Sequence, residues 1–261
     1  MEVLRPGRLA ESDPFVLLMD DRLDLPARRQ IGGAHPHAGL ETVTLVLEGA
    51  VHDRDEGTLS AGDAVWMTAG RGVIHNEHVE AEGNVRILQL WIGLPTRARE
   101  AEPSLQVLRR GSLPVRREPG VEVRVYSGRS GQAEAPTQNL VPVTLLEILL
   151  EPGATLTQEL PASYNGFLYV IEGALAGGAD AQAMKKGDVA WLERTTATGS
   201  STLTVSAAAE GARVVLYAGE PQKEPLIQRG PFVAESPAGL SRFFQRYQSN
   251  GFRKLSEIEP S

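Results

Sequence analysis

One segment of this chain occurs twice, and no other feature constrains the fold as strongly. In the first copy, residues 45–51 read LVLEGAV and residues 62–67 read GDAVWM, and in the second copy residues 169–175 read YVIEGAL and residues 187–192 read GDVAWL. A strand, a Glu-Gly turn, a short return strand and a Gly-Asp turn form the pattern of a β-hairpin. Two copies at this interval predict two similar β domains that arose by internal duplication.

Glycine and proline divide the rest of the chain into short segments. The 27 glycines and 17 prolines are spread along its whole length, and the segments between them are rich in Val, Leu, Ile and Thr. Several segments alternate apolar and polar residues, as half-buried strands do. The predicted strands cover residues 41–47, 86–92, 121–126, 143–149, 166–171, 202–207 and 213–217. This pattern predicts an all-β protein built as a sandwich or barrel.

A polar stretch and a closing helix set the predicted domain limits. Residues 129–139 contain little to bury, which is typical of a linker. We therefore expect an N-terminal domain over residues 1–130 and a C-terminal domain over residues 136–261. The second domain is expected to end in a helix that begins at Ser236, a good N-cap, with Pro237 in its first turn. The apolar stripe of this helix comprises Leu240, Phe243, Phe244 and Tyr247, and Gly251 is its expected end.

Composition excludes several classes of protein. The chain has 261 residues and no cysteine, which excludes disulfides, thiol nucleophiles and iron–sulfur clusters. A net charge of −7 argues against direct binding to nucleic acid or to an anionic membrane. The first residues carry acidic side chains and no apolar run, and no apolar stretch is long enough to span a bilayer. We expect a cytoplasmic protein without a signal peptide.

All five histidines lie in the first copy: His35, His37, His52, His75 and His78. Aligning the copies by hand places Glu159 opposite His35, Pro161 opposite His37, Ser200 opposite His75 and Thr202 opposite Glu77. The second copy thus keeps the hairpin pattern without any imidazole. A histidine-based site is therefore expected in the first domain alone.

Four of the first copy's residues form a candidate metal site. His35 and His37 are two residues apart, as are His75 and Glu77, and side chains at this spacing point to the same face of a strand. If the two strands face each other inside a barrel, three imidazoles and one carboxylate converge. This set suits Fe(II), Mn(II), Co(II), Ni(II), Cu(II) or Zn(II) and leaves open positions on a six-coordinate ion. His52, in a polar turn, and His78, with the opposite parity, are not expected to take part.

These motifs resemble those of the cupin superfamily and, more closely, of the pirin family of two-domain cupins. The resemblance covers nearly the whole chain and is carried by residues 34–44 (AHPHAGLETVT), 47–50, 62–77 (GDAVWMTAGRGVIHNE), 88–95 and the tail segments 218–221, 224–225 and 230–233. The chain departs from the family in the short hairpin after Val51, in Ala61 where a proline is usual, and at residues 234–236. The resemblance implies two cupin barrels face to face, with a short C-terminal α-helix.

The resemblance also implies a site and an activity. His35, His37, His75 and Glu77 become the ligands of one divalent metal ion, typically iron, with nickel, cobalt, manganese, copper or zinc as alternatives. Some family members resemble dioxygenases that open quercetin with O₂ and release carbon monoxide, and in such a reaction Glu77 would be the general base for the flavonol 3-hydroxyl. The expected partners are therefore a small aromatic substrate and O₂.

Further residues are assigned more loosely, and other functions stay open. Val43, Leu45, Met67 and Trp91 are candidates for lining the mouth of the site, and Glu41 and Gln89 for orienting the imidazoles. One alternative function is a non-catalytic, metal- and redox-dependent regulator that binds a protein partner. Another is a sugar isomerase or epimerase, which needs a mouth lined for carbohydrate.

Overall fold

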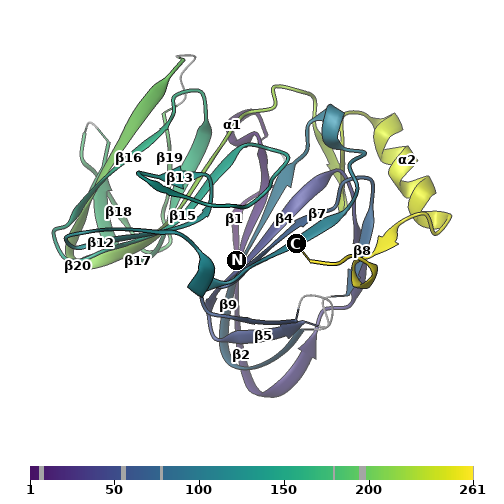
Figure 1. Cartoon of the computed structure of the whole chain (residues 1–261), viewed down its shortest axis with the longest axis horizontal. Helices are drawn as coiled ribbons and strands as arrows, with labels where there is room; N and C mark the ends of the chain where they lie inside the picture. Colours follow the sequence, from purple (N-terminus) through teal and green to yellow (C-terminus); the bar gives the residue numbers. More distant parts are fainter. Residues whose placement is uncertain (6–8, 54–56, 77–78, 179, 194–197, 261) are drawn as a thin grey trace. The chain divides into compact units, whose positions relative to one another are not determined.

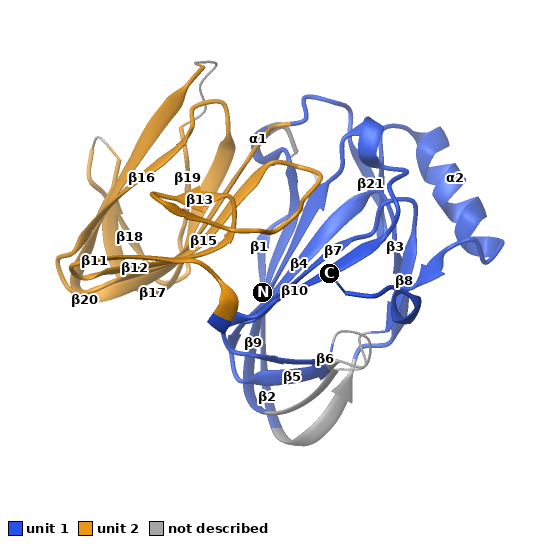
Figure 2. Cartoon of the chain, in the orientation of Figure 1, with its two compact units in different colours: residues 1–111, 222–261 blue, residues 112–221 orange. Residues whose placement is uncertain are grey.

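The chain is built almost entirely of β-strands (Figure 1). The computed structural model describes all residues except 6–8, 54–56, 77–78, 179, 194–197 and 261. It divides into two compact units, residues 1–111 with 222–261 and residues 112–221 (Figure 2). In the described part of the chain, no helix has the length and apolar character that crossing a membrane requires.

The first unit holds one large antiparallel sheet and two small ones. The large sheet has the strand order β1-β2-β9-β4-β7-β10, with β5 attached to β6 and β9, while β23-β8-β3 and β21-β22 form the small sheets. Its elements are β1 (Glu2–Leu4), α1 (Leu9–Ser12), β2 (Phe15–Ile31), β3 (Ala34–His37), β4 (Leu40–Glu48), β5 (Ala50–Asp53), β6 (Gly57–Ser60), β7 (Ala64–Thr68), β8 (Val73–Asn76), β9 (Val79–Gly93), β10 (Ser104–Leu108), β21 (Ile227–Arg229), β22 (Phe232–Ala234), α2 (Pro237–Gln248) and β23 (Arg253–Lys254).

The second unit is built around one sheet with the order β11-β12-β15-β20-β17-β18, to which β16 and β19 add. Its elements are β11 (Val115–Glu118), β12 (Val121–Ser127), β13 (Arg129–Ser130), β14 (Ala133–Glu134), β15 (Val143–Leu150), β16 (Thr155–Pro161), β17 (Asn165–Gly177), β18 (Gln182–Lys185), β19 (Val189–Trp191) and β20 (Ser200–Gly219). The predicted strands 202–207 and 213–217 are parts of the single strand β20. One strand serves both because its first part pairs with β16 and its second part with β15.

The repeated segment folds in the same way in both units, as the repeat predicts. The turn glycines have φ values of +76° and +70° at Gly49 and Gly173, and +90° and +91° at Gly62 and Gly187. The amide of Gly62 donates to the carbonyl of Val46 at 2.7 Å, and the amide of Gly187 donates to Val170 at 2.9 Å. Glycine adopts such left-handed backbone conformations without strain, so these turns explain why glycine recurs at these positions.

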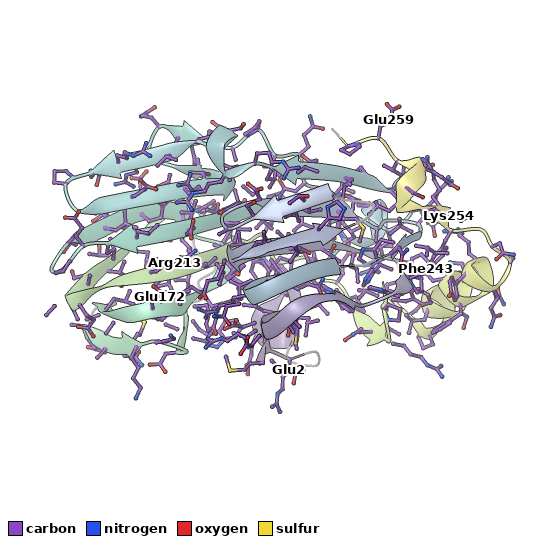
Figure 3. All side chains as sticks on the ribbon, turned by 90° about the horizontal axis from the view of Figure 1, so that it is seen from below. Glu2, Glu172, Arg213, Phe243, Lys254 and Glu259 are labelled. Carbon is purple, nitrogen blue, oxygen red and sulfur yellow. The ribbon has the colours of Figure 1, made fainter. Side chains whose placement is uncertain are left out.

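Each unit also contains a buried ion pair that the sequence pattern did not reveal. In the first, Arg86 holds both carboxylate oxygens of Asp20 at 2.9 Å, and both side chains are buried. In the second, Arg213 contacts the buried Glu147 at 2.6 Å. Each arginine also faces the glutamate of its Glu-Gly turn: Arg86 lies 3.5 Å from Glu48, and Arg213 lies 4.0 Å from Glu172. Arg213 and Glu172 are labelled in Figure 3. The two copies therefore share an electrostatic arrangement as well as a hairpin.

The division of the chain differs from the predicted limits of 1–130 and 136–261. Residues 129–139 are not a linker, because they include the β13–β14 hairpin and Ala133 packs against the core of the second unit. The last forty residues belong to the first unit rather than to the second. Their return is fixed where the amides of Gln222 and Lys223 donate to the Asp13 carboxylate at 2.9 and 2.8 Å.

Helix α2 forms as predicted and packs on the first unit. Ser236 accepts a hydrogen bond from the amide of Gly239 at 3.1 Å, which confirms it as the N-cap. The helix ends at Gln248, and Asn250, with φ of +57°, adopts the left-handed conformation expected of Gly251. Its buried residues join an aromatic cluster around Phe232, which comprises Ala38, Ala234, Leu240, Phe243 and Phe252.

Candidate metal centre

Two short strands bring three histidines together. β3 and β8 pair antiparallel, with His35 directly opposite His75. His37 lies two residues along β3 and therefore on the same face as His35. The ring centroids are 4.9 Å apart for His35 and His37, 4.3 Å for His35 and His75, and 5.0 Å for His37 and His75. One ring nitrogen from each residue lies within 4.8 Å of the others, as the spacing predicted.

A backbone carbonyl orients the first imidazole of the cluster. The Nδ1 of His35 lies 2.9 Å from the carbonyl oxygen of Gly33, so in the neutral ring Nδ1 carries the proton and donates it. The lone pair of Nε2 then points into the cluster, where the Nε2 of His75 is 2.9 Å away. This arrangement is typical of metal-binding histidines, whose second nitrogen is held by a backbone or carboxylate oxygen.

His37 is the most deeply buried member of the cluster. Its side chain is 2% exposed, and among the described residues neither ring nitrogen has a hydrogen-bond partner. Burial and the neighbouring His75 and His35 hold its pKa well below the ordinary value, although the nearby carbonyl of Pro231 opposes this shift without reaching the geometry of a hydrogen bond. His37 is therefore a neutral imidazole at pH 7, the state that a metal ion requires.

The three imidazoles fit a divalent transition metal. A buried nitrogen without a partner costs folding energy unless something binds it, and a metal ion would satisfy His37. Two nitrogens that each lie about 2.1 Å from one ion, at right angles, are about 3 Å apart, close to the observed separation of His35 and His75. The predicted fourth ligand and general base, Glu77, lies outside the described residues, as does His78. His52 is exposed, and its Nδ1 lies 2.8 Å from the Thr58 hydroxyl.

The predicted lining residues divide between two faces of the sheet. Thr42 pairs with both Met67 and Trp91, and these two join the core cluster that also contains Val73 of β8. The indole of Trp91 packs edge-on against His37, with centroids 5.1 Å apart and the planes at 84°. Met67 and Trp91 therefore belong to the face that carries the site.

Val43, Leu45 and Glu41 do not share that face. Side chains alternate between the two faces of a strand, and these three residues are an odd number of positions from Thr42 in β4. Their side chains therefore point to the face opposite that of Thr42. Glu41 is fully buried and accepts a hydrogen bond from the Thr68 hydroxyl at 2.8 Å, on the side of β4 opposite to Thr42. Gln89 has the parity of Trp91, and its expected role beside the imidazoles stays a prediction.

The chain's last residues support the strands of the site, which sequence reasoning missed. β23 pairs in parallel with β8, with Lys254 opposite Ile74. Gly39, two residues after His37, has φ of +77°, and a Cβ there would lie 1.8 Å from the carbonyl oxygen of Val233. The glycine at this position is the sequence signal that the tail approaches so closely.

The hand alignment of the second copy is shifted by one residue at the site. β16 alternates exposed and buried residues, and Glu159 and Pro161 are exposed while Leu160 is buried. Leu160 pairs with Ser201, and Glu159 pairs with Thr202 rather than with Ser200. The buried positions of β16 are Leu156, Gln158 and Leu160, so none of them carries an imidazole.

The chain matches two family models and is similar to known proteins over most of its length. The Pirin family model matches residues 4–92, and the Pirin C-terminal cupin domain model matches residues 145–253. Pirin-like protein 2 from Arabidopsis thaliana is 38% identical over 248 residues, which cover 92% of this chain and 76% of that protein.

Solved structures are similar over most of the chain. The crystal structure of GK1651 from Geobacillus kaustophilus is 43% identical, with a TM-score of 0.75 over 86% of this chain and 90% of that one. Quercetin 2,3-dioxygenase from Acinetobacter baumannii is 28% identical, with a TM-score of 0.83 over 96% of this chain and 90% of that one. Bacterial pirin YhhW from Escherichia coli, solved in complex with nickel(II), is 20% identical, with a TM-score of 0.60 over 82% of this chain and 86% of that one. At this identity the similarity shows only that the two proteins share a fold.

Proposed function

Because the chain belongs to the pirin family of two-domain cupins, we propose that it is a metal-dependent dioxygenase that acts on flavonols such as quercetin with O₂. The observation that carries the proposal is the buried convergence of three imidazoles, one of which has two nitrogens without a partner among the described residues. The similarity to a protein named quercetin 2,3-dioxygenase supports the choice of reaction.

The proposed ion is held by His35, His37 and His75, with Glu77 as the fourth ligand. Iron is the expected metal, and nickel, cobalt, manganese, copper and zinc are the alternatives that this donor set also suits. When bound, such an ion lowers the pKa of a coordinated hydroxyl group and offers positions for small molecules such as O₂.

The protein's own residues supply orientation and a dry environment. The Gly33 carbonyl fixes the ring of His35, and the indole of Trp91 fixes the ring of His37 by edge-on packing. Trp91 places apolar surface beside His37, and Met67 belongs to the core cluster against which Trp91 packs. We expect this apolar surface to exclude water and to suit a flat aromatic substrate. Glu77 is proposed to take the proton of the substrate hydroxyl as a general base.

An aerobic assay with quercetin tests the proposal. Protein loaded with one metal at a time is mixed with quercetin, and O₂ uptake, flavonol absorbance and bound metal are measured on the same samples. We expect stoichiometric loss of O₂ and quercetin, abolished in His75→Ala and retained in the matched control His52→Ala. Protein that holds its metal and leaves both O₂ and quercetin unchanged would overturn the dioxygenase and favour the alternative of a regulator that binds a protein partner.

A further inference from the structure

The second unit contains a cavity that no part of the proposed reaction uses. Its volume is about 380 Å³, within the range of sites for small molecules, which is roughly 300–1,000 Å³. Leu160, Leu168, Met184 and Val205 line it, and each of these side chains is at most 6% exposed. The inner wall of the cavity is therefore apolar.

The cavity is built from the same repeat as the histidine cluster. Leu168 of β17 pairs with Ala190 of β19, as Thr44 of β4 pairs with Val65 of β7 in the first unit. Leu160 on β16 pairs with Ser201 on β20 across the cavity wall. Where the first unit gathers imidazoles between two short strands, the second therefore has a leucine opposite a serine. Such a site can bind an apolar molecule, and because all five histidines lie in the first copy, it has no imidazole for a metal.

The rim of the cavity defines the chemistry of its ligand. Exposed polar side chains stand there, namely Gln182 and Ser201, which can donate and accept hydrogen bonds. Glu193 adds a carboxylate, which repels an anionic ligand such as a fatty acid. We propose that the second unit binds a neutral, largely apolar small molecule that carries a hydroxyl group, without any metal.

Fluorescence of the neutral probe N-phenyl-1-naphthylamine tests for the apolar site. The full-length protein, freed of metal by a chelator, is expected to bind one probe per chain with saturable enhancement. Ala190→Phe, which fills the cavity, should weaken binding at least tenfold, and so should Leu203→Trp, a second filling variant at the cavity wall. The matched control Ala183→Phe, on exposed β18 and outside the cavity, should change the affinity less than twofold.

The outcomes separate this site from the metal centre. The proposal is supported if His75→Ala still binds the probe and Ala190→Phe does not. Ala190→Phe must also keep the circular dichroism spectrum of the parent, which shows that it folds. The proposal is overturned if no saturable binding occurs, or if binding survives both filling variants. Probe release on loading metal would place the probe at the histidine cluster and would overturn it as well.

Competition with 2-naphthol tests the polar rim. A neutral ligand hydroxyl that bonds to the rim should make 2-naphthol displace the probe. Ser201→Ala should weaken the binding of 2-naphthol about two- to tenfold, the effect of losing one hydrogen bond, without changing probe affinity. Equal affinity of 2-naphthol for both proteins would contradict a hydrogen bond from Ser201 to the ligand. Tighter binding of naphthoate than of naphthol would contradict the role assigned to Glu193.

Discussion

The ring of Phe252 occupies the space that a side chain in place of Gly72 would need. A Cβ at Gly72 would stand 2.2 Å from Cε1 of Phe252, and Gly72 has φ of +134°. Gly72 directly precedes β8, the strand that carries His75. Phe252 directly precedes β23, and β23 pairs with β8. The tail and the metal-site strand are therefore locked together at this point.

We expect Gly72→Ala to destabilise the protein by about 2–4 kcal/mol, because the methyl group meets the Phe252 ring and the backbone conformation disfavours any side chain. Urea unfolding followed by fluorescence measures this loss. Gly111→Ala is the matched control, since a Cβ there meets nothing within 4 Å. Equal stability of the two variants would show that the tail does not press on β8.

Trp91 should report metal binding. Its indole packs against His37, so a copper(II) or nickel(II) ion bound by His37 would quench its fluorescence. Titration of metal-free protein is expected to show quenching that ends at one equivalent, and Trp91→Phe should lose most of it. Trp191→Phe, which removes a tryptophan of the second unit, should keep it. A signal carried by Trp191 instead would place the ion elsewhere.

The buried pair of Asp20 and Arg86 should be costly to break. Replacing Arg86 by Met removes the buried counter-charge of the Asp20 carboxylate and leaves the half-exposed Arg22 beside it. We expect a loss of about 3–5 kcal/mol in the free energy of unfolding. Arg71→Met, which breaks an exposed pair with Glu102 at 2.9 Å, should cost less than about 1 kcal/mol. Similar losses in both variants would argue against a buried charge.

The stability of the first unit should fall in acid partly through Glu235. Hydrogen bonds from its own backbone and from Arg242 and Arg99 lower its pKa from 4.5 to about 2. A group whose pKa is lower in the folded protein stabilises the fold above its unfolded pKa, and this contribution is lost as the pH falls from about 4.5 to about 2. Glu235→Gln should therefore be less stable at pH 6, and the difference should shrink toward pH 2.5. Urea titrations at several pH values measure it, and a difference that does not change with pH would contradict the shift.

The local elements were predictable because their signals are local. Glycine in the left-handed region marks the same turns in both copies, and two-residue spacing places His35 and His37 on one face of β3. Ser236 is an N-cap whatever the helix packs against. Such signals need no knowledge of which segments meet in space.

The predictions that failed depended on contacts between residues that lie far apart in the sequence. The apolar stripe of α2 indicates that the helix packs against the protein. It does not indicate that the helix packs beside Phe232 and Ala38 in the first unit. Residues 129–139 are polar and nevertheless form a hairpin on the core of the second unit. Asp20 and Arg86 give no periodic signal that they are buried together. The side of β4 that faces the site, which excludes Val43 and Glu41, follows only from its register with β7 and β9.

The metal content of purified protein tests the central claim most directly. Metal-free protein is loaded with iron(II) under anaerobic conditions, or with nickel(II), passed through a desalting column and analysed for metal per chain. We predict one ion per chain in the parent and in His52→Ala, and almost none in His37→Ala. Parent protein that retains no ion from either solution, or His37→Ala that retains as much as the parent, would contradict the assignment of the histidine cluster as a metal centre.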